Sequence, residues 1–176
     1  SGKCCSEGNH QYGIFDHAMA QAHQHHGIKN IFFGNIGIWF HFIDDERAIR
    51  KTLSEILSYE GFKVDEAADG EEGWKLFNDK NYDVVLCDIK MPKLDGLEFL
   101  GRATDKNPDV PVIMISGHGT IETAVDAVKK GAFDYVAKPP DLNRLLITIR
   151  NALDKNNLSK ETRTLKEAGS FKGLWR

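Results

Sequence analysis

Residues 82–96, "YDVVLCDIKMPKLDG", place a carboxylate at the end of an apolar strand. The run Val84 to Cys87 is continuously apolar, which is typical of a strand covered on both faces of a sheet. Asp88 ends this run, and Asp95-Gly96 offers turn chemistry a few residues later. Burying a carboxylate is costly unless another group compensates its charge, so the neighbours of Asp88 decide what this stretch is for.

Strand and helix patterns alternate along the rest of the chain. Apolar or alternating runs predict strands, and the segments between them carry apolar residues at helical spacing. This alternation favours a parallel sheet covered on both faces, so the sequence predicts an α/β fold with a doubly wound, five-stranded sheet. The strands are expected at 38–43, 62–67, 83–87, 110–116 and 133–137.

Polar side chains follow these strands at the points where the apolar runs end. The carboxyl ends of parallel strands meet at one edge of a sheet, where functional groups gather. A single acid at such a place is equally consistent with a helix cap. Here the set is larger, and comprises Asp44, Asp45, Asp88, Ser116 with Gly117, and Lys138.

These groups suit phosphoryl transfer. Three neighbouring carboxylates repel one another, and Mg²⁺ is a natural counter-ion because it binds a few oxygens and shares sites with phosphate. Lys138 supplies a point charge for a phosphoryl oxygen, and the hydroxyl of Ser116 supplies a hydrogen bond. Asp88 is the candidate nucleophile, which would form an acyl phosphate.

Four motifs in order carry a resemblance to a known family: "IDDE" (43–46), "DIKMPKLDG" (88–96), "ISGHG" (115–119) and "YVAKPP" (135–140). Together they resemble the receiver domain of two-component response regulators, over about residues 38–154. The stretch after residue 115 is most similar to receivers of the NtrC-like, σ54-dependent activators. The resemblance implies the flavodoxin-like receiver fold and a Mg²⁺-dependent phosphoacceptor that acts on itself, not an enzyme with an external substrate.

The resemblance also implies roles for the acids and their neighbours. Asp88 is expected to be the phosphoacceptor. Asp45, with Asp44 beside it, is expected to hold Mg²⁺ together with Asp88 and the backbone carbonyl of Lys90. Lys138 is expected to pair with the acceptor or its phosphate, and to precede a cis peptide bond.

A switch is implied in the same way. Ser116 would turn toward the phosphoryl group, and Tyr135 would change rotamer as the hydroxyl moves. Outside this constellation, Ser116 would be expected merely to end a strand and Tyr135 to be a core residue. Lys90 and His118 lie two residues beyond the acceptor and the switch hydroxyl, where their side chains would tune hydrolysis of the phosphate.

The implied partners are a sensor histidine kinase or phosphotransfer protein, and a second copy of the chain is a further candidate. A net charge of −3 gives no electrostatic footprint for nucleic acid, and no Walker A motif or basic region is present. The sequence contains no run of eighteen apolar residues that would span a membrane. The cysteines form no disulfide framework, which predicts a cytoplasmic protein.

The two ends of the chain differ from its middle. Residues 1–36 are expected to be an N-terminal extension, either a leader added for expression or a loose segment. Residues 37–154 would form the receiver domain, and 155–176 a linker helix and tail. Leu158 and Leu165 are seven residues apart, a weak sign of a dimerising helix.

Three other interpretations remain open. A haloacid-dehalogenase-like phosphatase also uses an aspartate nucleophile, but that family carries a second aspartate two residues later, where this chain has Lys90. A receiver fold that signals by contact alone would leave the acceptor unused. Finally, residues 1–42 could be a metal- or partner-binding extension that blocks or replaces the first strand. The cluster His23, His25 and His26 and the pair Cys4-Cys5 suit zinc or nickel, and His41 is unusual in a covered strand.

Overall fold

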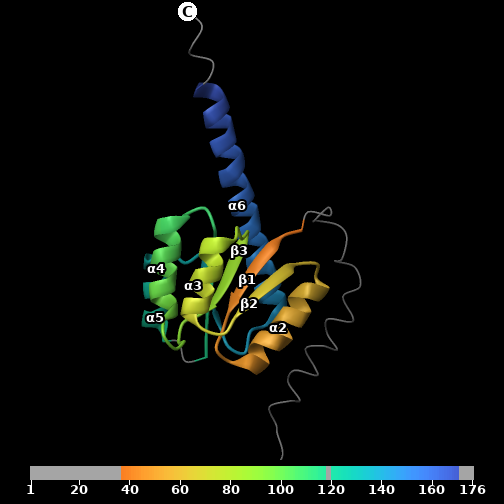
Figure 1. The fold of residues 1–176 in the computed structure, drawn as a ribbon, viewed down its shortest axis with the longest axis vertical. Helices are drawn as coiled ribbons and strands as arrows, with labels where there is room; N and C mark the ends of the chain where they lie inside the picture. The colour runs from red at the N-terminus through yellow and green to blue at the C-terminus, as the bar shows by residue number, and fades with distance from the viewer. Residues whose placement is uncertain (1–36, 118–119, 171–176) are drawn as a thin grey trace, which may run out of the picture.

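The computed structural model describes residues 37–117 and 120–170, with side chains described as far as residue 158. Five parallel strands form one sheet in the order β2-β1-β3-β4-β5 (Figure 1). This arrangement confirms the predicted fold class. The strands are β1 (Trp39–Ile43), β2 (Lys63–Ala67), β3 (Val84–Asp88), β4 (Val112–Ser116) and β5 (Asp134–Ala137).

Helices connect the strands and begin and end at the residues that local chemistry favours. Asp69 accepts a hydrogen bond from the backbone N–H of Glu72, and Asp141 accepts one from that of Arg144, so each caps a helix start. Gly61, between the first helix and the second strand, has a φ of 97°, a conformation that glycine adopts without strain. The helices are α2 (Arg47–Tyr59), α3 (Gly70–Asp79), α4 (Gly96–Lys106), α5 (Ile121–Lys129) and α6 (Leu142–Ser170).

Alternate residues of each central strand enter two different cores. On β3, Val84 and Leu86 pack into the cluster shared with α2 and α6, whereas Val85 and Cys87 pack into the cluster shared with α3, α4 and α5. Figure 1 shows these helices on opposite sides of the sheet. The continuous apolar run is therefore explained, because both faces of β3 are buried. Cys87 is a buried free thiol, as the sequence predicts.

The strand register brings the acids together. After β1 the chain adds β2 on one side, and it then crosses to build β3 on the other, so the strand order reverses at β1. Ile43 is the register partner of Cys87 in β3. The residues that follow these partners are Asp44 and Asp88, which consequently emerge side by side at the carboxyl edge of the sheet.

His41 occupies an unexpected place in the middle of β1. It is fully buried and stacks on Tyr82 with ring centroids 4.5 Å apart. Its Nε2 lies 2.9 Å from the carbonyl oxygen of Gly73, and its Nδ1 lies 3.4 Å from that of Asp65. A neutral imidazole carries one N–H, and the shorter distance places it on Nε2. His41 thus ties β1 to α3, and β1 is an integral strand of the sheet.

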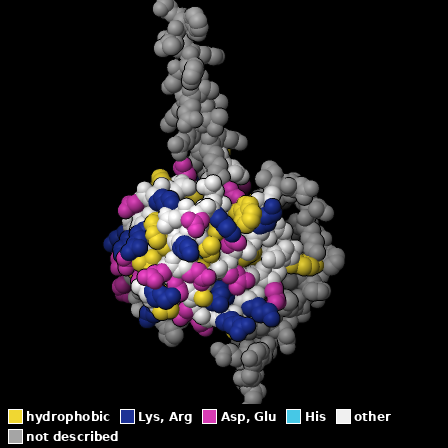
Figure 2. Space-filling view, in the orientation of Figure 1, with side chains coloured by type: hydrophobic (Ala, Val, Ile, Leu, Met, Phe, Trp, Pro, Cys, Tyr) yellow, Lys and Arg dark blue, Asp and Glu magenta, His cyan; other side chains and the backbone are white. Residues whose placement is uncertain are grey.

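Helix α6 continues past the body of the domain, as Figure 1 shows. Asn156 is still buried there, and its side-chain amide donates to the carbonyl oxygen of Asp83 at 2.8 Å. Leu158 is 65% exposed, and the side chain of Leu165 lies outside the described residues. Within the part of the chain that the structure describes, no helix is long and apolar enough to cross a membrane. Basic and acidic side chains are interspersed on the face drawn in Figure 2.

The buried imidazole makes the stability of the domain depend on pH. Burial lowers the pKa of His41 below 6.5, although the carbonyl groups of Gly73 and Asp65 and the charge of Asp65 oppose this shift; Lys80 adds to it. Below pH 6.5 the imidazole of His41 therefore binds a proton in the unfolded chain more readily than in the folded chain. As the pH is lowered below 6.5, the free energy of unfolding of the parent chain should fall relative to that of His41→Leu. The difference should grow by up to about 1.4 kcal/mol per pH unit. Urea denaturation between pH 5 and 7.5 measures this difference, and parallel profiles would contradict it.

Candidate functional site

A single ammonium group is surrounded by carboxylates at the carboxyl edge of the sheet. Nζ of Lys138 lies 2.9 Å from Oδ2 of Asp44 and 2.9 Å from Oδ2 of Asp88. Oε1 of Glu46 lies 3.0 Å from the same nitrogen. The side chain of Lys138 is 6% exposed, as is that of Asp88, and that of Asp44 is fully buried. Three carboxylates thus share one ammonium group, and the ammonium group and two of the carboxylates are buried.

Each member of this cluster is held by the element that carries it. Asp44 follows β1, and its Oδ1 accepts a hydrogen bond from the backbone N–H of Glu46 at 2.8 Å. Asp88 is the last residue of β3, and the next residue, Ile89, donates its N–H to Ile115 on β4. Lys138 follows β5, and its own N–H donates to the carbonyl oxygen of Ser116 at 2.8 Å. The sheet therefore fixes the backbone of all three strand ends.

Burial and pairing act in opposite directions on the charges. Burial raises the pKa of Asp44 to about 6, although Lys138 opposes the shift. Burial also raises the pKa of Asp88, again against the effect of Lys138, and the nearby charge of Asp45 raises it further. For Lys138, burial alone would lower the pKa, but pairing with Asp44, Asp88 and Glu46 holds it above its usual range. The acids favour a positive charge beyond the one that Lys138 supplies.

The arrangement fits a divalent cation. Ligand oxygens of Asp44, Glu46 and Asp88 all lie within 4.8 Å of one another. Oδ2 of Asp44 is buried, and no described donor approaches it with hydrogen-bond geometry even though Lys138 is close. Carboxylate oxygens are the ligands that Mg²⁺ prefers. With Lys138, the three acids sum to two negative charges, which one divalent cation would neutralise.

The turn after Asp88 is packed too closely to admit a side chain at Gly96. A Cβ there would clash with the carbonyl oxygen of Asp88 and would lie 2.8 Å from the Cα of Ile89. The N–H of Gly96 donates to the carbonyl oxygen of Ile89 at 2.9 Å, which closes the turn. Asp95 then caps α4 by accepting from the N–H of Leu97. Gly96 thus lets the start of α4 rest directly against the strand end that carries Asp88.

The other predicted residues lie around this cluster. Ser116 is buried at the end of β4, one residue beyond Ile115, the register partner of Asp88. Tyr135 is partly buried, and its hydroxyl group is enclosed without a hydrogen-bond partner among the described residues. The Lys138–Pro139 peptide bond is cis, as the resemblance implies.

Two of the remaining predicted residues are exposed. Asp45 points to solvent beside the cluster, and Lys90 is exposed two residues beyond Asp88. His118 lies outside the described residues, as do the histidines and adjacent cysteines of residues 1–36.

Glu46 is a residue of this site that the sequence interpretation missed. It ends the "IDDE" motif and is the N-cap residue of α2, but its side chain caps no backbone group of the helix. Instead the carboxylate reaches Lys138, which is 92 residues away along the chain. Its position directly after the acid pair was the available signal, but local spacing does not show which way a side chain points.

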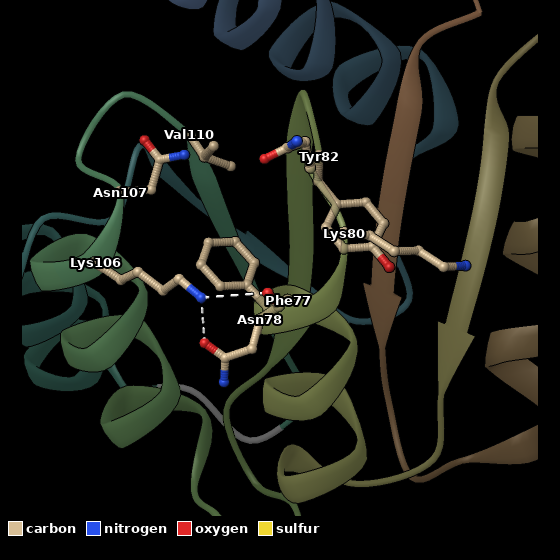
Figure 3. A pocket seen from close by; sticks show the side chains of 8 residues that line it. Phe77, Asn78, Lys80, Tyr82, Lys106, Asn107 and Val110 are labelled. Carbon is tan, nitrogen blue, oxygen red and sulfur yellow. Dashed lines mark hydrogen bonds between the residues drawn. The ribbon is translucent and has the colours of Figure 1, made fainter.

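A small cavity of about 60 Å³ lies elsewhere, at the opposite end of the strands (Figure 3). It is lined by residues that end α3 and α4 and precede β3 and β4, among them Phe77, Tyr82 and Val110. Lys106 crosses its rim and donates hydrogen bonds to Asn78, so the ends of the two helices are tied together. No carboxylate of the cluster around Lys138 lines this cavity.

Comparison with known proteins agrees with this geometry. Residues 40–150 match the family model of the response regulator receiver domain. The chain is 39% identical over 133 residues to the regulatory protein AtoC of Escherichia coli, covering 76% of this chain and 29% of that protein. It is 39% identical over 127 residues to the nitrogen assimilation regulatory protein NtrX of Azorhizobium caulinodans, covering 71% of this chain and 28% of that protein.

Solved structures show the same likeness. A CheY-like receiver domain protein from Methanospirillum hungatei has a TM-score of 0.68 at 31% identity, covering 70% of this chain and 99% of that one. NtrX from Brucella abortus has a TM-score of 0.69 at 37% identity, covering 74% of this chain and 30% of that one. The chain therefore spans less than a third of the length of the curated relatives named above.

The chain belongs to the response regulator receiver domain family, whose members are phosphoacceptors of two-component signalling. Its relatives place it more narrowly, as a receiver of the NtrC-like regulators. Receiver domains generally use Mg²⁺, which agrees with the acidic cluster. The family match does not support the phosphatase alternative, and Lys90 stands where that family carries its second aspartate.

The close packing at Gly96 leads to a test with a matched control on the same helix. Gly96→Ala forces a methyl group against the Asp88 backbone, so the free energy of unfolding should fall by about 1–3 kcal/mol. A methyl group at Gly101 would meet no atom within 4 Å, so Gly101→Ala should raise stability by up to about 1 kcal/mol through helix propensity. Urea denaturation of both variants at 25 °C measures the contrast, and equal effects would contradict it.

Proposed function

We propose that Asp88 accepts a phosphoryl group from a phosphohistidine and that the domain thereby switches the output of a response regulator. One observation carries the proposal: the Asp88 carboxylate ends a buried strand, 2.9 Å from Nζ of Lys138 and within 4.8 Å of the Asp44 carboxylate oxygen. A carboxylate with a purely structural role would not need further acids beside it. An aspartate that accepts a phosphoryl group needs them, because neighbouring acids bind the cation that the reaction requires.

In the transfer, an oxygen of the Asp88 carboxylate forms a bond to phosphorus while the phosphorus–nitrogen bond of the donor breaks. The electron pair of that bond returns to the donor imidazole, so no other reactant is needed. Lys138 stabilises the charge on the phosphoryl oxygens, since its ammonium group already contacts Asp88. Catalysis in this class depends on positioning and electrostatics, and the three strand ends supply both.

Asp44, Asp45, Asp88 and the backbone carbonyl of Lys90 would hold Mg²⁺. Bound there, the ion would neutralise charge shared between the carboxylates and the phosphoryl oxygens. Two of these ligands, Asp44 and Asp88, belong to the acidic cluster around Lys138, which supports such an ion. Asp45 is exposed beside the cluster, from where it can turn toward an ion that enters from solvent. Autophosphorylation and autodephosphorylation of Asp88 would then depend on Mg²⁺.

The switch would pass through Ser116 and Tyr135. Phosphorylation adds strong acceptor oxygens at the end of β3, which gives the hydroxyl of Ser116 a reason to turn toward them. In its present rotamer, Tyr135 has an enclosed hydroxyl group with no hydrogen-bond partner among the described residues. A change to another rotamer would therefore lose no hydrogen bond and need cost little free energy. A small electrostatic change would thus shift the population between two packings.

The surface next to this switch is apolar and exposed on α5. Ile121 is 82% exposed, Val128 54% and Val125 44%. Such a surface suits contact with a partner or with a second copy of the chain. One similar solved structure is described as a beryllofluoride-activated NtrC4 receiver domain dimer. A homodimer is therefore the first state to test once Asp88 is phosphorylated.

The partners follow from the same chemistry. A sensor histidine kinase or a phosphotransfer protein would supply the phosphoryl group in the cytoplasm, where the thiol of Cys87 stays reduced. The output would be transcription, because two further relatives, DctD of Rhizobium meliloti and ZraR of Klebsiella oxytoca, are named transcriptional regulatory proteins. Lys90 and His118 would tune hydrolysis of the acyl phosphate from either side. A receiver that signals by contact alone would keep this fold but leave Asp88 unmodified.

Intact mass spectrometry after incubation with Mg²⁺ and phosphoramidate tests the proposal. The parent chain should gain one phosphoryl group, and Asp88→Asn should gain none because it lacks the nucleophilic oxygen. Asp105→Asn makes the same change on the exposed side of α4 and should react like the parent. Chelation of Mg²⁺ should abolish the gain. Phosphorylation of Asp88→Asn to the same extent as the parent would contradict the assignment of Asp88 as the phosphoacceptor.

A further inference from the structure

Glu46 differs from the two other acids that contact Lys138. Its side chain is 58% exposed, whereas that of Asp44 is fully buried and that of Asp88 is 6% exposed. Asp44 is also held by a backbone N–H, and Asp88 is the last residue of a central strand. The backbone of Glu46 lies at the start of a helix, but its carboxylate accepts a hydrogen bond from Lys138 at 3.0 Å and does not cap the helix. It is therefore the member of the cluster that can leave most easily.

A phosphoryl group on Asp88 would need the same ammonium group. Nζ of Lys138 donates hydrogen bonds to Asp88 and Glu46 and lies 2.9 Å from Oδ2 of Asp44, so three carboxylate oxygens already crowd it at 2.9–3.0 Å. An incoming phosphoryl oxygen competes with these oxygens for the ammonium charge and for the space around it. Loss of the Asp44 contact would leave a buried carboxylate without its positive partner, whereas a displaced Glu46 carboxylate becomes hydrated by water.

We infer that Glu46 is a positioning residue that holds Lys138 in the unphosphorylated domain and competes with the phosphoryl group for it. The inference rests on the proposed phosphorylation of Asp88 and adds a residue that sets its extent. The Glu46–Lys138 ion pair stabilises the unphosphorylated state alone. Its loss should therefore favour the phosphorylated state and speed its formation. Hydrolysis starts from a state in which the pair is already broken, so its rate should not change.

Three variants separate the contact from the charge. Glu46→Gln removes the negative charge at nearly constant size. Glu46→Asp keeps the charge but shortens the side chain by one methylene group, and aspartate remains a favourable N-cap residue for α2. Glu98→Gln is the matched control, because Glu98 is 57% exposed and also ion-paired, but with Arg102.

The first measurement uses no turnover. Beryllofluoride with Mg²⁺, a mimic of the phosphoryl group, is titrated into each protein and its affinity measured by calorimetry. Because exposed ion pairs contribute little, both Glu46 variants should bind about two- to fivefold more tightly than the parent. Glu98→Gln should match the parent. Affinity for Mg²⁺ alone should stay within about twofold in Glu46→Asp, since its charge is kept.

The second measurement follows the reaction. The rate of Asp88 phosphorylation by phosphoramidate should rise by the same factor in both Glu46 variants, with an unchanged rate constant for hydrolysis. A parent-like Glu46→Asp beside a faster Glu46→Gln would overturn the inference, because charge alone would then explain the effect. Weaker beryllofluoride binding in both variants would also overturn it. If the parent binds no beryllofluoride and takes no phosphate, the proposed function itself fails.

Discussion

The charge imbalance around the ammonium group of Lys138 is the constraint on which the rest of the structure depends. Formation of the sheet brings Asp44 and Asp88 to adjacent strand ends, where both are buried. Such a pair is stable only beside a positive charge. Lys138 supplies one charge from β5, two strands away from β3, and is itself held between the acids. The cluster therefore keeps more negative than positive charge, which favours a further cation.

Two packed faces keep this cluster in place. The alternation of side chains on β3 anchors it to α2 and α6 on one side and to α3, α4 and α5 on the other. His41 adds a polar link between β1 and α3 within the second core. In contrast, the groups that would respond to phosphorylation are less constrained. Glu46 is mostly exposed, and the hydroxyl of Tyr135 lacks a partner among the described residues. A rigid acceptor with adaptable neighbours suits a switch.

Much of the fold was predictable because its signals are local. The apolar run of β3, which the structure bears out, and the capping side chains of Asp69 and Asp141 act within a few residues. His41 was harder, because a polar residue in a covered strand looks like a reason to doubt the strand. Its partners are backbone carbonyl groups of Gly73 and Asp65, and a sequence does not display which carbonyl oxygens a distant segment leaves accessible.

The sequence by itself determined the order of the elements and the residue types at the strand ends, because hydrophobic periodicity and capping operate over short distances. Four motifs in order were enough to predict the family. Only the tertiary structure decided which of these groups share a charge. Lys138 meets Asp88 and Glu46 across 50 and 92 residues of chain, and of the two exposed acids Asp45 and Glu46 it is Glu46 whose carboxylate reaches the ammonium group. Those choices depend on strand register and on competition for one ammonium group, and both exist only in the folded chain.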